Sequence, residues 1–141
     1  MKELPGDVFV SPQILPAHIQ VLAEQGVMTI INNRPDMEAG PTQPLSDDMS
    51  DAAMATKIDY AFIPMAGGLS PALIEATVNA YENMPRPIFA YCASGTRSTA
   101  LWCFAHVQSL GVDGVLDAAA NAGYNLEQIR GGLTQYLESR A

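Results

Sequence analysis

A cysteine followed closely by an arginine is the feature of this sequence that could do chemistry. The stretch CASGTR places Cys92 directly after the apolar run IFAY, Arg97 five residues later, and a helix-like stretch from Ser98 onward. Backbone N–H groups between a strand and a helix have no partner in either element, so they can form an anion-binding nest. Gly95 allows the chain to turn, and the guanidinium of Arg97 suits an oxyanion. We therefore predict an anion-binding loop with Cys92 as the catalytic nucleophile and Arg97 as its catalytic cation.

The same loop predicts a thiol of lowered pKa. A free cysteine with a pKa near 8.5 is only about 3% thiolate at pH 7. A helix N-terminus contributes at most about 2 kcal/mol, or roughly 1.5 pKa units, so the loop donors and Arg97 have to supply the rest. We expect a pKa of about 5–7 for Cys92, which would make it reactive without a histidine partner. The alternative is a buried cysteine that acts only as a small hydrophobe at the end of a strand.

Other residues of this loop are candidates for holding the anion. The hydroxyl of Ser98 either caps the following helix or donates to the thiolate, and the sequence leaves both interpretations open. Cys103, on that helix, could resolve a persulfide on Cys92 by forming a disulfide, although its apolar neighbours favour a thiol of the core. The predicted anion- and substrate-binding residues of the loop are Ala93, Ser94, Gly95, Thr96 and Ser98.

A second loop, residues 34–48, brings further polar side chains. Arg34 follows a predicted strand, and it either binds an anionic substrate or pairs with Asp36 or Glu38. Asn33 is a candidate for substrate binding or for ordering the loop. Asp36, with Glu38 beside it, is a possible acid that would protonate a leaving group, and solvated loop carboxylates are the alternative.

The order of the predicted elements supplies the frame for these loops. Apolar, β-branched runs alternate with stretches of helical periodicity, which is typical of a mostly parallel sheet with helices on both faces. We predict one α/β domain over residues 1–141, with four to five strands. Ligands in such folds bind beyond the carboxyl ends of the strands, where Asn33–Arg34, Ala66–Gly67 and Cys92 would meet. The predicted strands are 7–14, 27–33, 59–65 and 86–92, and the predicted helices are 15–26, 47–57, 70–84, 98–110, 113–123 and 125–139.

Composition narrows the class of partner. The 141 residues carry a net charge of −8 with only seven Lys and Arg, which argues against a nucleic-acid partner and against an anionic membrane. No apolar run approaches the roughly 18 residues of a membrane span, and the first residues lack the apolar stretch of a signal peptide. With two cysteines we expect a cytoplasmic protein with reduced thiols. The spacing of His, Cys and carboxylates predicts no metal, and no glycine-rich loop predicts a nucleotide cofactor.

Four stretches in this order resemble the beta-lactamase-hydrolase-like phosphatase-like domain family. They are INNRPDMEAG (31–40), DYAFIPM (59–65), AYCASGTRSTALW (90–102) and NAGYNLEQIRGGL (121–133). The resemblance implies a compact relative of the dual-specificity phosphatases, and thus a cysteine-phosphatase-like three-layer sandwich. It also implies a functional link to a sulfur dioxygenase of metallo-beta-lactamase type, because the domain occurs alone or fused to one.

Members of this family are labelled phosphatases or sulfurtransferases, and two features bear on the choice. Cysteine phosphatases carry five residues between Cys and Arg, whereas four separate Cys92 from Arg97, as in single-domain rhodaneses. The segment PMAGGLSP (64–71), where phosphatases place an acid, contains none. We therefore expect a persulfide sulfurtransferase with a small anionic sulfur substrate. A phosphomonoester or protein phosphatase that forms a phosphocysteine is the alternative, and a non-catalytic anion-binding module is the third possibility.

Overall fold

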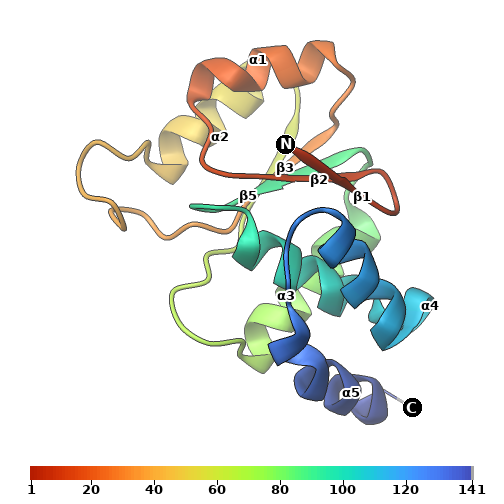
Figure 1. Cartoon of the computed structure of the whole chain (residues 1–141). Coiled ribbons are helices and arrows are strands. Elements are labelled where there is room, and N and C mark those ends of the chain that lie inside the picture. The colour runs from red at the N-terminus through yellow and green to blue at the C-terminus, as the bar shows by residue number, and fades with distance from the viewer. Residues whose placement is uncertain (141) are drawn as a thin grey trace.

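The computed structural model describes residues 1–140 of the chain. A five-stranded sheet lies between two layers of helices, with α1 and α2 on one face and α3, α4 and α5 on the other (Figure 1). The predicted α/β three-layer sandwich is confirmed. The elements are β1 (Lys2–Leu4), β2 (Val8–Ser11), α1 (Pro16–Glu24), β3 (Thr29–Asn32), α2 (Ser46–Ala55), β4 (Asp59–Phe62), α3 (Pro71–Asn83), β5 (Ile88–Tyr91), α4 (Thr96–Asn121), the 3-10 turn η1 (Glu127–Ile129) and α5 (Arg130–Ser139).

The strand order β1-β2-β5-β3-β4 places β5 at the centre of the sheet. β5 is parallel to both of its neighbours, and β4 is parallel to β3. The register pairs Tyr91 with Ser11 on one side and with Asn32 on the other, and it pairs Asn32 with Phe62. The carboxyl ends of four parallel strands are therefore level, and the loops that follow them open onto one edge of the sheet.

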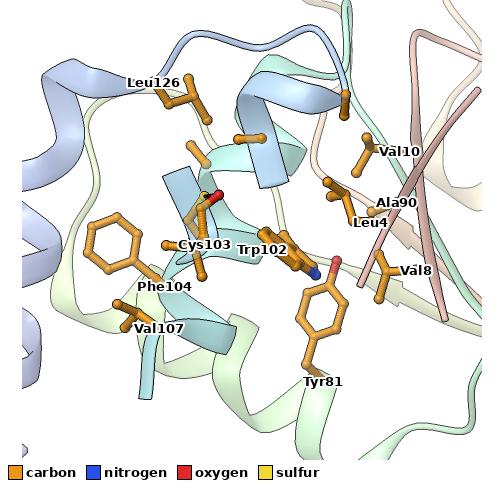
Figure 2. Close-up of a cluster of buried hydrophobic side chains, with 14 of the residues drawn as sticks. Leu4, Val8, Val10, Tyr81, Ala90, Trp102, Cys103, Phe104, Val107 and Leu126 are labelled. Carbon is orange, nitrogen blue, oxygen red and sulfur yellow. Dashed lines mark hydrogen bonds between the residues drawn. The ribbon is translucent and has the colours of Figure 1, made fainter. Parts of the chain in front are cut away.

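The central strand β5 is apolar at every position because both faces of the sheet are covered. In β5, Ile88 and Ala90 belong to the core beneath α3, α4 and α5, whereas Phe89 and Tyr91 belong to the core beneath α1 and α2. This alternation follows from the two-residue repeat of a strand. The larger core centres on Trp102 of α4, which has no exposed surface (Figure 2). Burial of such side chains, at about 1.5–3 kcal/mol each, fixes the strand ends that carry the loops.

The helix after β5 begins earlier than its pattern predicts. α4 starts at Thr96 rather than at Ser98, because Gly95 caps it with φ of 94°. α4 extends to Asn121, but at Gly111 its backbone leaves the helical region, with φ of 78° and ψ of 166°. The predicted break between two helices at Gly111 is thus confirmed. The last predicted helix, 125–139, opens as the turn η1 and becomes α5 at Arg130.

The sequence pattern does not predict the first strand, β1. β1 pairs antiparallel with β2, with Lys2 opposite Val10 and Leu4 opposite Val8. Gly6, with φ of 89°, and Asp7, with φ of 59°, make the turn between them. Three residues with two charges show no apolar alternation, so local sequence gives no sign of this edge strand.

Candidate active site

Cys92 lies at the first position after the central strand, on the floor of the loop that leads into α4. Its N–H donates to the carbonyl oxygen of Ser11 at 3.4 Å, and the residue has no exposed surface. The loop reverses direction at Gly95, whose left-handed backbone lets its N–H donate to the Cys92 sulfur at 3.1 Å. The loop thus presents main-chain donors to the sulfur atom, as the sequence predicts.

Two opposing effects set the pKa of Cys92. Burial raises it, because a thiolate loses hydration in the interior. The backbone N–H groups of Ser98, Ser94 and Gly95 favour the thiolate, as does the Ser98 hydroxyl when it turns from Asn33 toward the sulfur, and together they outweigh burial. The pKa of Cys92 is therefore lowered, in the direction that its position predicts.

Asn33 and Ser98 connect the loop to neighbouring strand ends. The Ser98 hydroxyl donates to Asn33 Oδ1 at 2.8 Å, and Asn33 Nδ2 donates to the carbonyl oxygen of Ile63 at 2.8 Å. The N–H of Asn33 donates to the carbonyl oxygen of Tyr91 at 2.8 Å. Both side chains are buried. The helix-cap interpretation of Ser98 was wrong, since Gly95 holds that position, and Asn33 orders the site from within.

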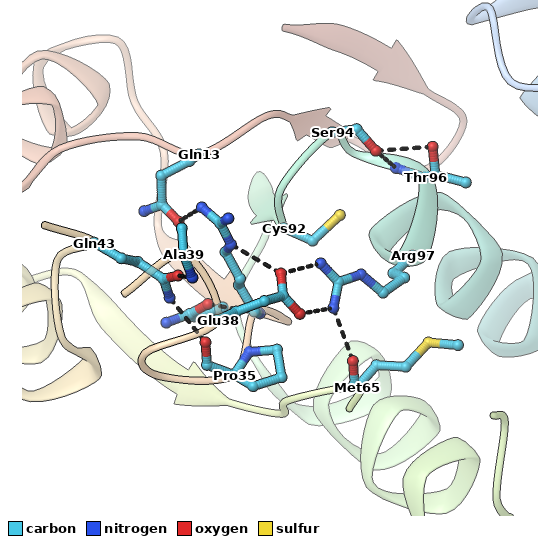
Figure 3. Close-up of polar contacts among 12 residues, drawn as sticks. Gln13, Pro35, Glu38, Ala39, Gln43, Met65, Cys92, Ser94, Thr96 and Arg97 are labelled. Carbon is cyan, nitrogen blue, oxygen red and sulfur yellow. Dashed lines mark hydrogen bonds and ion pairs between the residues drawn. The ribbon is translucent and has the colours of Figure 1, made fainter. Parts of the chain in front are cut away.

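Arg97 and Arg34 converge on a single carboxylate, that of Glu38 (Figure 3). Arg97 donates to both Glu38 oxygens, at 2.7 and 2.8 Å, and to the carbonyl oxygen of Met65 at 2.9 Å. Arg34 Nε donates to Glu38 Oε1 at 3.0 Å. Of the alternatives for Arg34, pairing with Glu38 is the one that this structure shows. The two guanidinium groups touch the same Glu38 oxygen, so the site holds two cations close together.

The candidate acids are engaged elsewhere. The hydrogen bonds from Arg97, with a further one from Arg34, lower the pKa of Glu38 to about 2 against the opposing effect of burial, so this side chain is a carboxylate at neutral pH. Asp36 accepts a hydrogen bond from the N–H of Ser46 at 2.8 Å, where α2 begins. It therefore caps that helix, and this structure does not present Asp36 as an acid to Cys92.

The loop that carries Glu38 is anchored on both sides of it. Gln43 is 6% exposed. Its amide donates to the carbonyl oxygen of Pro35 at 2.8 Å and accepts from the N–H of Ala39 at 2.9 Å. These contacts close a small ring of chain around Glu38. The backbone on both sides of Glu38 is thus held independently of its carboxylate.

The remaining loop residues form the rim. Ala93, Ser94 and Thr96 are exposed, and the Ser94 hydroxyl donates to Thr96 Oγ1 at 3.0 Å. Cys103 instead faces the core, where its sulfur contacts the carbonyl oxygen of Val115 at 3.8 Å. Burial raises the pKa of Cys103 to about 12, so the core interpretation of this thiol fits the structure.

The sequence did not predict three residues that contribute to this site. Gln13 accepts a hydrogen bond from Arg34 at 3.2 Å, and the Met65 carbonyl fixes Arg97. Gln13 and Met65 each follow a strand that ends at this edge of the sheet, and their place in the topology could have indicated them. Tyr124, just beyond the end of α4, donates to the carbonyl oxygen of Ser94 at 3.1 Å. Its distance along the chain from Cys92 gives no indication of this contact.

Within residues 1–140, no three His, Cys, Asp or Glu side chains gather in a way that could hold a metal ion. Across the same residues, no helix has both the length and the apolar character needed to cross a bilayer.

The family described as "Beta-lactamase hydrolase-like protein, phosphatase-like domain" matches residues 1–109 of the chain. That span includes Cys92, Arg97, Arg34 and Glu38. The chain belongs to this family. The resemblance seen in the sequence is thus confirmed, and the loop described above is the cysteine loop of a phosphatase-like domain.

A curated relative and two solved structures are similar to this phosphatase-like domain. The beta-lactamase hydrolase-like protein of Agrobacterium fabrum is 37% identical over 97 residues, which make up 66% of this chain and 22% of the relative. The chain therefore spans about a fifth of the length of that protein. A protein of Neisseria meningitidis, provisionally named a phosphatase, has 29% identity and a TM-score of 0.80 over 96% of both chains. The catalytic core of the PP-IP phosphatase SIW14 of S. cerevisiae has 17% identity and a TM-score of 0.68, over 95% of this chain and 83% of its own. The last of these likenesses bears on the fold alone.

Proposed function

We propose that this domain is a cysteine-dependent phosphatase-type hydrolase that acts on a small phosphomonoester. The observation that carries the proposal is the thiol of Cys92, which has a lowered pKa and lies among main-chain donors beside Arg97. The Neisseria meningitidis relative, at 29% identity over nearly the whole chain, supports the same class of activity. Sulfur transfer was our first expectation from the sequence. It takes second place because the similar proteins are phosphatases or phosphatase-like.

The chemistry would proceed in two displacements. The Cys92 thiolate attacks phosphorus, so that an S–P bond forms and the P–O ester bond breaks. The departing oxygen takes a proton from solvent. Water then attacks the phosphocysteine, which releases phosphate and restores the thiolate. The loop N–H groups and the Arg97 guanidinium would hold the charged phosphoryl oxygens during both steps.

The substrates are limited by the lack of a side chain positioned to protonate the leaving group. Residues 64–71 contain no carboxylate, and Glu38 is ionised by its arginine partners. Departure of an alkoxide without a proton donor is slow, because general acids contribute about 10²–10⁴-fold. We therefore expect substrates whose leaving group is already a stable anion, such as an aryl oxide.

A persulfide sulfurtransferase is the second candidate, and the four-residue spacing between Cys92 and Arg97 favours it. Cys92 would attack the outer sulfur of thiosulfate, the S–S bond would break, and sulfite would leave. Cyanide or an acceptor thiol would then take the sulfur from the Cys92 persulfide. Under this proposal the partner is a small anionic sulfur compound in the cytoplasm, and a sulfur dioxygenase of metallo-beta-lactamase type would act on related substrates.

A side-by-side assay separates the two functions. We would measure p-nitrophenyl phosphate hydrolysis and thiosulfate:cyanide sulfur transfer with the wild type, with Cys92→Ser and with the core control Cys103→Ser. The proposal predicts phosphate release that is inhibited by vanadate, lost in Cys92→Ser and kept in Cys103→Ser. Sulfur transfer without phosphate release, together with a 32-dalton adduct on Cys92 by intact mass, would overturn it in favour of the second candidate.

A further inference from the structure

The Glu38 carboxylate occupies a place built for an anion. It is a planar, singly charged group held by three charge-assisted hydrogen bonds from two arginines, with N–O distances of 2.7–3.0 Å. Its side chain is 32% exposed, whereas those of Arg34 and Arg97 are 14% and 24% exposed. The anion is therefore the outermost member of the trio, and the two cations remain in the protein when it moves away.

Both arginines are held independently of Glu38. Arg97 donates to the Met65 carbonyl at 2.9 Å, and Arg34 donates to Gln13 at 3.2 Å. If the carboxylate swings out, two guanidinium groups stay in place, each with N–H groups free for a new acceptor. Because both touch one Glu38 oxygen, they can hold neighbouring anionic groups of one compact molecule.

The two cations have different positions relative to the nucleophile. Arg97 follows the Cys92 loop and also interacts with the Cys92 sulfur, which raises the pKa of this arginine less than its bond to Glu38 does. Arg34 follows β3 and contacts Glu38 through Oε1 alone, whereas Arg97 contacts both oxygens of the carboxylate. An anion transferred to Cys92 would thus lie on Arg97, and the part of the substrate that departs would lie toward Arg34.

We propose that Arg34 is a specificity residue that binds an anionic leaving group, and that the preferred substrates carry two adjacent anionic groups, as a phosphoanhydride does. This inference rests on the proposed function, and it agrees with the missing acid, because an anionic phosphate departs without being protonated first. In the unliganded protein the Glu38 carboxylate occupies both Arg97 and Arg34, so a substrate has to displace it from both arginines.

Binding measurements on the unreactive Cys92→Ser protein test this directly. Isothermal titration with pyrophosphate and with orthophosphate gives the preference between a double and a single anion. Arg34→Met should lower pyrophosphate affinity about tenfold and orthophosphate affinity no more than about twofold, since one charged hydrogen-bond partner of the second group is lost. Arg34→Lys, which keeps the charge without the planar fork, should give an intermediate loss.

A matched control removes the same charge elsewhere. Arg130 on α5 also bridges two carboxylates, those of Glu127 and Asp113, so Arg130→Met controls for net charge and for loss of an ion-pair cluster. It should leave both affinities unchanged. Glu38→Gln should tighten both ligands by roughly two- to fivefold, the scale of a partly exposed ion pair that no longer competes.

Equal losses of affinity for both ligands in Arg34→Met would overturn the inference. Weaker binding of the ligands to Glu38→Gln would also overturn it, because Glu38 would then be a residue that positions Arg97. Turnover of p-nitrophenyl phosphate by the wild type, measured in parallel, separates this failure from that of the proposed function. Turnover without an Arg34-dependent preference refutes only the specificity role. The preference without turnover refutes the hydrolase and leaves the two-anion site standing.

Discussion

Replacement of Gly95 by alanine tests the geometry of the cysteine loop most severely. At φ of 94° a side chain costs about 1–2 kcal/mol from backbone strain alone. The added Cβ would also collide with the hydroxyl of Tyr124 and lie 3.0 Å from its Cζ atom. Overpacking of this kind costs a further ~1–3 kcal/mol. Gly95→Ala should thus lower the free energy of unfolding by about 2–5 kcal/mol.

Gly26 provides the matched control. It has the same φ of 94°, yet a Cβ there meets nothing within 4 Å. Gly26→Ala should therefore show only the backbone part, about 1–2 kcal/mol. Urea unfolding followed by circular dichroism measures both variants. Adding Tyr124→Ala to Gly95→Ala should remove the part of the loss that exceeds that of Gly26→Ala. If Gly95→Ala is no more destabilising than Gly26→Ala, Tyr124 does not pack on the loop and the described geometry is wrong.

Three further predictions concern charge. Ser98→Ala removes a hydroxyl that can turn from Asn33 to the Cys92 thiolate, so the midpoint of iodoacetamide alkylation of Cys92 should move to higher pH, while an unmoved midpoint would show that the backbone donors suffice. Cys103, with its pKa raised to about 12, should stay unlabelled in the folded protein near neutral pH, and peptide mapping that finds rapid labelling would contradict its placement in the core. The folded-state pKa of Glu38, about 2, lies below its unfolded value of 4.5. Its ion pairs therefore stabilise the fold above pH 4.5 and lose that effect as the pH falls toward 2. The Tm difference between wild type and Glu38→Gln should shrink over this range, and a constant difference would refute the ion-pair assignment.

The sequence predicted the parts of the fold that depend on local pattern. Apolar runs such as Ile88–Tyr91 mark strands because both faces of the sheet are buried at these positions. Ser70, directly before Pro71, is of a residue type that caps helices, and its side chain accepts from the N–H of Leu73 at 3.1 Å. The convergence of the strand ends follows from parallel topology, which places Cys92 and Arg34 at one edge of the sheet.

The features that the sequence did not predict depend on contacts between residues far apart in the chain. Glu38 and Arg97 are 59 positions apart, and their pairing is set by how the loop from Pro35 onward folds on Gln43. The start of α4 was misplaced because Gly95 can end a turn or cap a helix, and only its φ decides between them. Spacing between cysteine and arginine led us toward sulfur transfer, whereas the similar proteins favour phosphate chemistry.

The rate of alkylation of Cys92 against pH is the most direct test of the account. Iodoacetamide labelling in the wild type, with Cys92→Ser as the blank and Cys103→Ser to isolate the signal, gives a midpoint that does not depend on how often the buried sulfur becomes accessible. The loop donors predict a midpoint below that of an unperturbed cysteine. A midpoint at or above that value would mean that burial outweighs the loop donors, and Cys92 would be a structural thiol.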